Sequence, residues 1–273
     1  MPELPEVETI VRGLNKSILN KEISLVEIHY PNIINGSETK FIKALLNKSF
    51  NQISRHGKYI FFKTEAGHEI TLHLRMTGQV FIVPINNKTD KHTHLEIFFK
   101  NLKSKLIYRD IRKFGRFEYL TNTTKNLYIK QKKLAPDALQ ISYNQFISNL
   151  KSKNKNIKAC LLDQSIICGL GNIYVDEALN QSQISPNSKP NIPENKAKEL
   201  LMKINSILKN SIAAGGTSFS DYIDSTGKKG SYLKQLKAYL QTGKKCQNCK
   251  GIITKDKIAG RGSYHCTSCQ KIY

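Results

Sequence analysis

The spacing of apolar residues near the start of the chain predicts a short helix. Apolar side chains three and four residues apart lie on one face of a helix. The residues with this spacing are Val7, Ile10, Val11 and Leu14. Pro5 suits the first turn of such a helix, and Gly13 is expected near its end.

Alternation of apolar and polar residues then predicts a series of short strands. In residues 69–74, the side chains of Ile70, Leu72 and Leu74 lie on one face of an extended chain, and polar side chains lie on the other. The runs of this kind are 23–30, 58–63, 69–75, 79–83, 94–99, 105–109 and 116–120. Many strands at short spacing, with turn residues between them, predict an antiparallel β-sandwich or barrel up to about residue 120.

The pattern changes after these strands. Residues 121–133 are polar and rich in lysine, which is typical of a linker. Helical spacing dominates from Asp137 onward and is clearest over 194–214. Residues 216–232 contain Gly, Ser, Thr, Asp and Lys without periodicity, so we expect a mobile loop there.

The composition indicates a polyanionic partner. The 273 residues include 43 Lys and Arg but only 21 Asp and Glu, which gives a formal net charge of +22, and both halves of the chain contribute to the excess. Nucleic acid is the polyanion that proteins with such a charge most often bind. Compositional drift toward lysine is the alternative explanation.

Three further features bear on location and redox chemistry. No stretch of 18 apolar residues is present, so no membrane span is expected. The N-terminus lacks the basic and apolar regions of a signal peptide. Six cysteines without a secretion signal favour metal binding over disulfides. We therefore expect a cytoplasmic protein, long enough for two modest domains.

The last 28 residues carry the spacing of a zinc site. Two Cys-x2-Cys pairs are separated by sixteen residues, as in four-thiolate tetrahedral sites, and they consist of Cys246, Cys249, Cys266 and Cys269. Four thiolates leave no open coordination position, so we expect one structural Zn²⁺. Arg261 is expected at a hairpin tip between the pairs, as a phosphate contact or a solvated charge. Cys160 and Cys168 do not fit the pattern and are expected in the core.

The N-terminus offers a candidate nucleophile. Removal of Met1 would leave Pro2 as a secondary amine, which titrates far below a lysine and can attack a sugar C1′ to form a Schiff base. Glu3 is a candidate acid–base partner, and Glu6 a candidate to orient it. Ordinary helix capping is the alternative role for these residues.

Four segments, in this order, resemble the bacterial formamidopyrimidine-DNA glycosylases. They are residues 1–10 (MPELPEVETI), 110–115 (DIRKFG), 169–178 (GLGNIYVDEA) and the finger that contains Gly260-Arg261. The resemblance extends from end to end. It implies excision of oxidised purines, chiefly 8-oxoguanine and formamidopyrimidines, from duplex DNA, followed by β- and δ-elimination.

The resemblance also implies roles for individual catalytic residues. Pro2 would attack C1′ of the lesion nucleotide, and Glu3 would donate protons during base departure and imine formation. Lys58 matches the position assigned as proton donor for β-elimination, and Arg261 the one for δ-elimination. A phosphate contact at a strand end is a second role open to Lys58.

Three residues match those that fill the gap left by the flipped base, namely Met76, Arg112 and Phe114. Met and Phe suit a wedge between base steps, and an arginine can satisfy the acceptor edge of the orphaned cytosine. Outside this motif Phe114 would be expected in the core.

Further matches imply contacts with the DNA backbone. Asn172 is expected to cap the helix that follows Gly169-Leu-Gly171, where helix N–H groups bind a phosphate in a helix–two-turn–helix element. Lys153 and His92 match other DNA-contact positions. In isolation Lys153 is typical of a solvated charge, and His92-x-His94 of a strand surface. Residues 217–230 correspond to the lesion-capping loop of the family.

The expected fold class is therefore α+β, with four parts. They are a catalytic antiparallel β-sandwich with a flanking helix (1–120), a linker (121–136), a helical DNA-binding domain with the helix–two-turn–helix (137–232) and a four-cysteine zinc finger (233–273). The family's usual Tyr-Gly-Arg before the finger is Tyr-Leu-Gln at 239–241 here, which removes one cation and a flexible glycine from this connection.

Two alternatives remain at this point. An endonuclease VIII-like glycosylase would share the fold and the proline chemistry but act on oxidised pyrimidines. A non-catalytic zinc-ribbon protein that binds nucleic acid would explain the charge and the cysteines but not the N-terminal motif. The expected partner is damaged double-stranded DNA, bound by a monomer.

Overall fold

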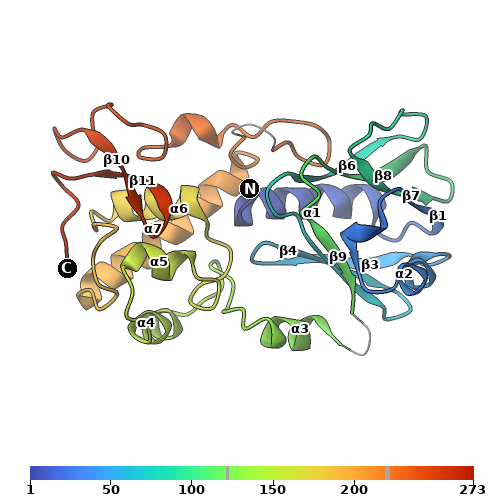
Figure 1. The fold of residues 1–273 in the computed structure, drawn as a ribbon, viewed down its shortest axis with the longest axis horizontal. Coiled ribbons are helices and arrows are strands. Elements are labelled where there is room, and N and C mark those ends of the chain that lie inside the picture. The colour runs from blue at the N-terminus through green and yellow to red at the C-terminus, as the bar shows by residue number, and fades with distance from the viewer. Residues whose placement is uncertain (121–122, 219–221) are drawn as a thin grey trace. The chain divides into compact units, whose positions relative to one another are not determined.

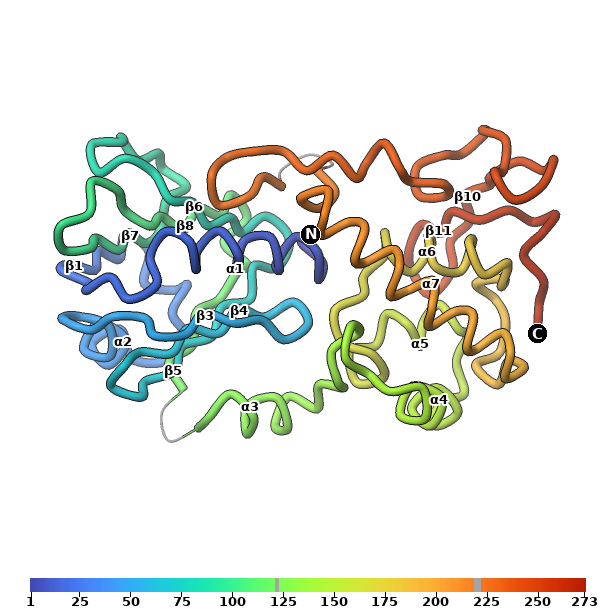
Figure 2. The backbone as a smooth tube through the Cα atoms, turned by 180° about the vertical axis from the view of Figure 1, so that it is seen from behind, coloured from blue at the N-terminus to red at the C-terminus, as the bar shows by residue number. Residues whose placement is uncertain are grey.

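The computed structural model describes residues 1–120, 123–218 and 222–273. The chain forms two compact units: residues 1–131 with 214–231, and residues 132–213 with 232–273. Residues 214–231 thus return to the first unit after the helices of the second (Figures 1 and 2).

The first unit contains two packed sheets. One has the strand order β2 (Ile34–Asn35), β9 (Arg116–Tyr119), β5 (Glu69–His73), β4 (Tyr59–Thr64) and β3 (Phe50–His56). The other has the order β1 (Ile23–Ile28), β7 (Thr93–Phe99), β8 (Ser104–Asp110) and β6 (Gly78–Pro84). All pairings are antiparallel except the short β2–β9 pair, which is parallel. The predicted sandwich is confirmed.

The core of this unit lies between the sheets and helix α1 (Leu4–Ile18). Alternate residues of the strands enter it; Ile70 and Leu72 of β5 are both buried there. Tyr108 and Phe117, one from each sheet, pack edge to face with ring centroids 5.0 Å apart. The two-residue periodicity therefore identifies the core-facing side of these strands.

Helix α1 is longer than expected, because Gly13 does not end it. A Cβ atom on Gly13 would lie only 1.9 Å from Oγ of Ser225, in the segment that returns to this unit. The glycine is needed for close packing of that segment against the helix, a tertiary contact that local sequence does not reveal.

Several elements were not expected. Strand β3, helix α2 (Glu38–Leu45) and the 3₁₀ turn η1 (Pro31–Ile33) lie in stretches without clear alternation. In β3 the buried residues Phe50 and Ile53 are three apart, because the register with β4 shifts between Phe50 and Gln52. Such a bulge breaks the two-residue pattern from which strands are predicted.

Part of the predicted linker is helical. Residues Lys125–Gln131 form helix α3, whose Tyr128 is buried against Phe61 and Leu120. The sequence pattern does not reveal these apolar contacts, because lysines surround Tyr128 in the sequence. Residues 121–122 lie outside the described part of the chain.

The second unit consists of helices and a zinc-finger hairpin. Its elements are α4 (Tyr143–Lys151), α5 (Ile157–Leu162), α6 (Asn172–Gln181), α7 (Glu194–Ala213), η2 (Tyr232–Gln235), β10 (Ile253–Ile258) and β11 (Arg261–Cys266). Helix α7 confirms the amphipathic prediction over 194–214, and its Leu200 and Ile204 are buried. Cys160 and Cys168 are buried, as expected. Within the described residues, no helix is both long and apolar enough to cross a membrane.

Candidate active site and nucleic-acid interface

The N-terminal residues are fixed at the start of helix α1. Pro2, Glu3 and Glu6 are buried. Glu3 is the N-cap residue, and it forms a reciprocal capping box with Glu6, whose Oε2 accepts the backbone N–H of Glu3 at 2.8 Å. The capping role expected from the sequence is therefore present, and it holds Glu3 in one place beside Pro2.

The segment that returns to the first unit also contacts Glu6. The other carboxylate oxygen of Glu6, Oε1, accepts the N–H of Thr217 at 2.8 Å. The hydroxyl of Tyr222 donates to the carbonyl oxygens of Glu6, at 3.3 Å, and of Gly215, at 3.2 Å. In Figure 2 this orange segment passes over α1 and β6. Within the expected loop at 216–232, Thr217 and Tyr222 are therefore hydrogen-bonded to the N-terminal helix, and Tyr232 begins η2. Residues 219–221 lie outside the described part.

Lys58 is located at the turn between β3 and β4 and is buried. His73 on β5 is nearby, and its ring packs edge to face against Tyr59, with centroids 4.6 Å apart. Burial, and then the charges of Arg75 and Lys58, lower the pKa of His73 to about 3. The imidazole is therefore neutral at pH 7, and its Nδ1 accepts the N–H of Arg75 at 3.0 Å.

Met76, Arg112 and Phe114 lie together and are exposed. The Arg112 guanidinium lies 4.7 Å from the ring centroid of Phe114, and its Nη1 lies 3.0 Å from Sδ of Met76. Met76 is 45% exposed and Phe114 is 47% exposed. Two apolar groups and one guanidinium thus extend from a single surface, which suits insertion into a gap in a base stack.

Asp110 organises this surface, a role that was not expected from the sequence. Its buried carboxylate accepts from the hydroxyls of Thr77 at 2.5 Å and Tyr108 at 3.0 Å, and from the N–H of Gly115 at 2.8 Å. It also accepts the N–H of Arg112 at 3.2 Å. A Cβ atom on Gly115 would lie 1.8 Å from the Tyr108 hydroxyl. The aspartate and the glycine at the ends of the 110–115 motif are thus explained by packing.

The two histidines near this surface differ. His92 is partly exposed, and its backbone N–H donates to Asp90. His94 is buried, and its Nε2 lies 2.8 Å from the carbonyl oxygen of Asp110. The expectation of two strand-surface histidines was therefore wrong for His94.

In the second unit, Asn172 does not cap helix α6. Gly171 is the N-cap residue, and Asn172 is the first helical residue. The Asn172 amide donates to the carbonyl oxygen of Gly262 at 2.9 Å, while its Oδ1 is buried without a hydrogen-bond partner among the described residues. Lys153 follows helix α4 and is partly exposed. The helix start is thus joined to the zinc finger.

A buried lysine–aspartate pair lies at this junction. Lys158 of α5 and Asp176 of α6 are both buried, with Nζ and Oδ1 2.6 Å apart. Lys158 also donates to the Gly262 carbonyl at 3.3 Å, and Asp176 accepts the N–H of Tyr264 at 3.0 Å. Nothing in the local sequence pairs these two residues, because Asp176 stands beside a second acidic residue, Glu177, and Lys158 follows a lysine-rich run.

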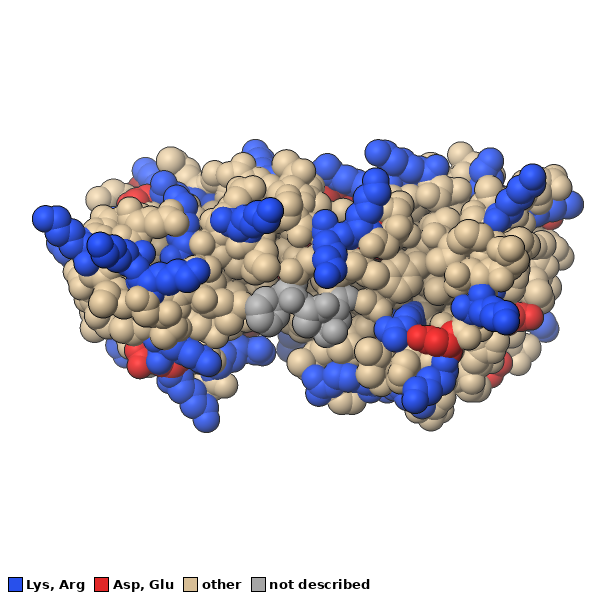
Figure 3. All heavy atoms as spheres, turned by 90° about the horizontal axis from the view of Figure 1, so that it is seen from above, with Lys and Arg blue, Asp and Glu red and all other residues tan. Residues whose placement is uncertain are grey.

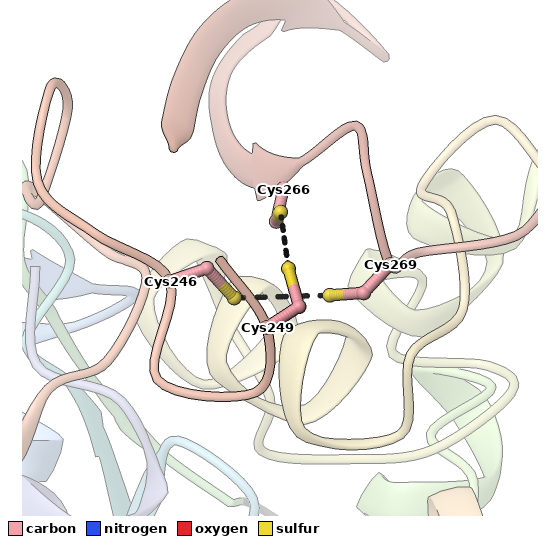
Figure 4. A group of neighbouring side chains, drawn as sticks. All are labelled: Cys246, Cys249, Cys266 and Cys269. Carbon is pink, nitrogen blue, oxygen red and sulfur yellow. Dashed lines mark hydrogen bonds between the residues drawn. The ribbon is translucent and has the colours of Figure 1, made fainter. Parts of the chain in front are cut away.

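The cysteine cluster fits one zinc ion. The Sγ atoms of Cys246 and Cys269 are 3.7 Å apart, and those of Cys249 and Cys266 are 3.5 Å apart (Figure 4). A tetrahedron with Zn–S bonds of about 2.3 Å has edges of about 3.8 Å. The four sulfur atoms lie within 4.8 Å of one another. The four thiolates form a structural zinc site.

Arg261 begins β11 and is exposed, at the tip of the β10–β11 hairpin as expected. Before the finger, Leu240 has a φ of 61°, in the left-handed region. A left-handed conformation costs a residue with a side chain about 1–2 kcal/mol. Leu240 therefore strains this connection.

Basic side chains are spread over the surface. Figure 3 shows one face on which lysines and arginines are frequent and acidic side chains are few. This distribution fits a polyanion that touches many points, because each phosphate needs its own nearby cation.

Three family models match the chain along its length. They describe the formamidopyrimidine-DNA glycosylase N-terminal domain (residues 1–117), the H2TH domain of the same enzyme (134–222) and a zinc finger found in FPG and IleRS (243–272). A formamidopyrimidine-DNA glycosylase of Lactobacillus gasseri is 39% identical, with all of both chains covered. The chain belongs to the formamidopyrimidine-DNA glycosylase family. The enzyme of that name from Carboxydothermus hydrogenoformans is 38% identical over 99% of this chain and 100% of its own.

Solved structures of family members have the same fold. A Lactococcus lactis FPG mutant, bound to DNA that contains Fapy-dG, has a TM-score of 0.93 and 36% identity. MutM in complex with carbocyclic 8-oxo-G DNA has a TM-score of 0.92 and 36% identity. Each comparison covers 99% of this chain and 100% of the other.

Proposed function

We propose that this chain is a bifunctional DNA glycosylase and abasic-site lyase that removes oxidised purines from duplex DNA. The full-length similarity to formamidopyrimidine-DNA glycosylases carries the proposal. Its substrates are 8-oxoguanine and formamidopyrimidines, and it acts as a monomer in the cytoplasm, on DNA of the nucleoid. We assign catalysis to residues 1–120 and DNA binding to 137–232 and 233–273, with 121–136 as the connection.

The first chemical steps use the N-terminal residues. Once Met1 is removed, the Pro2 nitrogen attacks C1′ of the lesion nucleotide. The glycosidic bond between C1′ and the base nitrogen breaks, and the base leaves with the electron pair of that bond and a proton from Glu3. Glu3 then takes the ammonium proton of Pro2 and passes it to O4′ as the sugar ring opens. The product is an iminium between Pro2 and C1′. The buried capping box supports this assignment, because it holds Glu3 next to Pro2.

Strand cleavage follows from the iminium, which is an electron sink. Loss of a proton from C2′ and cleavage of the C3′–O bond release the 3′ phosphate, to which Lys58 donates a proton. Loss of the C4′ proton and cleavage of the C5′–O bond then release the 5′ phosphate, with Arg261 as the donor. Glu6 orients Glu3 and links it to the segment that contains Thr217.

DNA contacts are assigned to two sets of residues. Met76, Arg112 and Phe114 fill the space of the flipped nucleotide, and their exposure and mutual contacts support this role. The residues that contact the DNA backbone are His92, Lys153 and Asn172.

Borohydride trapping tests the proposed function. The protein is incubated with a duplex that contains 8-oxoguanine opposite cytosine, and borohydride reduces the iminium to a stable covalent adduct. We expect an adduct and release of 8-oxoguanine, with little release of thymine glycol from a matched duplex. Preference for thymine glycol would favour an endonuclease VIII-like enzyme, and no adduct would favour a protein that only binds DNA.

Intact mass measured on the same sample provides the control. Retained Met1 adds about 131 Da and converts the Pro2 nitrogen to an amide, which cannot form the iminium. Only the lighter species should be trapped.

A further inference from the structure

Glu8 of helix α1 is shared by two arginines that differ in burial. Its Oε1 lies 2.8 Å from Nε of Arg12, one helical turn away, and its Oε2 lies 2.9 Å from Nε of Arg55 on strand β3. The Arg12 side chain is 61% exposed, whereas that of Arg55 is 8% exposed. An exposed i,i+4 ion pair contributes little to stability, so we take the largely buried pair with Arg55 as the one that holds the two elements together.

Arg55 has a second partner at the turn that contains Lys58. Its Nη1 donates to the carbonyl oxygen of Gly57 at 3.2 Å. Gly57 directly precedes Lys58 in this turn. One guanidinium therefore joins helix α1, through Glu8, to the residue next to Lys58.

The chemistry of the pair suits a rigid connection. Burial by itself raises the pKa of Glu8, but the hydrogen bonds and charges of Arg12 and Arg55 outweigh this effect and lower the pKa below its ordinary value. The carboxylate is thus ionised at neutral pH. A planar guanidinium can donate from Nε and Nη1 in fixed directions, which a lysine ammonium cannot do.

We propose that Glu8 and Arg55 are positioning residues for strand cleavage, because they fix the turn that contains Lys58 relative to the helix that begins beside Pro2. This inference rests on the proposed function. Base release requires residues at the start of α1, whereas β-elimination also requires Lys58. Loss of the Glu8–Arg55 connection should therefore slow cleavage more than base release.

The test compares two rates in Arg55→Gln, Glu8→Gln and the control Arg12→Gln, all at saturating enzyme. One rate is base release from an 8-oxoguanine duplex, and the other is cleavage of a preformed abasic site. Misplacement of a catalytic group by about 1 Å can cost up to about a hundredfold in rate. For Arg55→Gln and Glu8→Gln we expect cleavage to fall about ten- to hundredfold and base release to fall less than about threefold. Arg12→Gln should change neither rate by more than about twofold, because its pair is exposed.

The double variant and the trapped fraction complete the design. If two residues act as one connection, the effects of their substitutions are not additive. The double variant Glu8→Gln with Arg55→Gln should therefore cleave no more slowly than the slower single variant. The inference is overturned if Arg55→Gln cleaves at the wild-type rate, if Arg12→Gln is equally slow, or if both rates fall together with the borohydride-trapped fraction. Failure of the wild-type protein to trap would instead refute the proposed function, and with it this inference.

Discussion

At the scale of single residues, the carboxylate of Asp110 determines how the exposed side chains of its loop are presented. It accepts hydrogen bonds from Thr77, Tyr108 and Gly115, and all of these lie within 3.0 Å. A buried carboxylate with several donors is strongly held, because any loss leaves a charged group unsatisfied. Arg112 and Phe114 can therefore be exposed and still have defined positions.

The role of Phe114 can be separated from stability by a matched variant. Phe114 is 47% exposed and Ile111, in the same loop, is 46% exposed. Both Phe114→Ala and Ile111→Ala should change the free energy of unfolding by less than about 0.5 kcal/mol. We expect only Phe114→Ala to slow release of 8-oxoguanine, by about tenfold or more, because a wedge offsets the cost of unstacking. Equal rates for the two variants would contradict the role of Phe114.

The depressed pKa of His73 predicts a pH-dependent stability. The unfolded chain takes up a proton at this histidine below pH 6.5, whereas the folded chain does so only near pH 3. The unfolded state therefore binds more protons in this interval, and stability falls as the pH is lowered from 6.5 toward 3. The contribution is at most about 1.4 kcal/mol per pH unit.

Urea unfolding at pH 7.5, 5.5 and 4.5, followed by circular dichroism, measures this effect. His73→Gln should lose less stability than the wild type between pH 7.5 and 4.5, because glutamine does not titrate. Parallel stability curves for the two proteins would show that His73 is not responsible.

At the scale of elements, the zinc-finger hairpin has a strained turn. Ile258 pairs with Arg261, so the turn contains only Ala259 and Gly260, with φ angles of 53° and 73°. A two-residue turn with both φ angles positive favours Asn-Gly, because asparagine tolerates this conformation better than alanine.

Replacement of the turn residues should have opposite effects on the hairpin. Ala259 is exposed, so Ala259→Asn should remove strain without loss of packing and stabilise the finger by up to about 1 kcal/mol. Gly260→Ala should destabilise it by about 1 kcal/mol or more, because it forces a Cβ into the left-handed region. Thermal unfolding of the zinc-loaded protein distinguishes the two, and a shift of equal sign in both variants would contradict the turn assignment.

At the scale of the whole molecule, the charge of +22 governs the affinity for DNA. If six to eight phosphates are neutralised, the logarithm of the affinity should fall with the logarithm of the salt concentration at a slope of about −5 to −7. Titrations of an undamaged duplex at several salt concentrations measure this slope.

Lys153→Ala should make this slope less steep by about one unit, if Lys153 contacts a phosphate. A slope near zero would mean that the charge reflects composition alone.

The periodic elements and the local motifs could be predicted from the amino-acid order. Helices α1 and α7 and most strands of the sandwich follow from apolar spacing, because one face of each must be buried. The cysteine pairs predicted the zinc site, because a thiolate tetrahedron needs short loops between its ligands. The N-terminal capping box likewise depends only on neighbouring residues.

Contacts between distant segments became visible only in the folded chain. The fit of Gly13 against Ser225, the bond from Thr217 to Glu6 and the pairing of Glu8 with Arg55 join residues that are far apart in the sequence. The bulged strand β3 escaped prediction for a related reason, because its register is set by its partner β4. The periodicity of apolar residues shows which side chains of an element are buried. A single polar contact between distant segments does not produce a periodic pattern, so it cannot be predicted in this way.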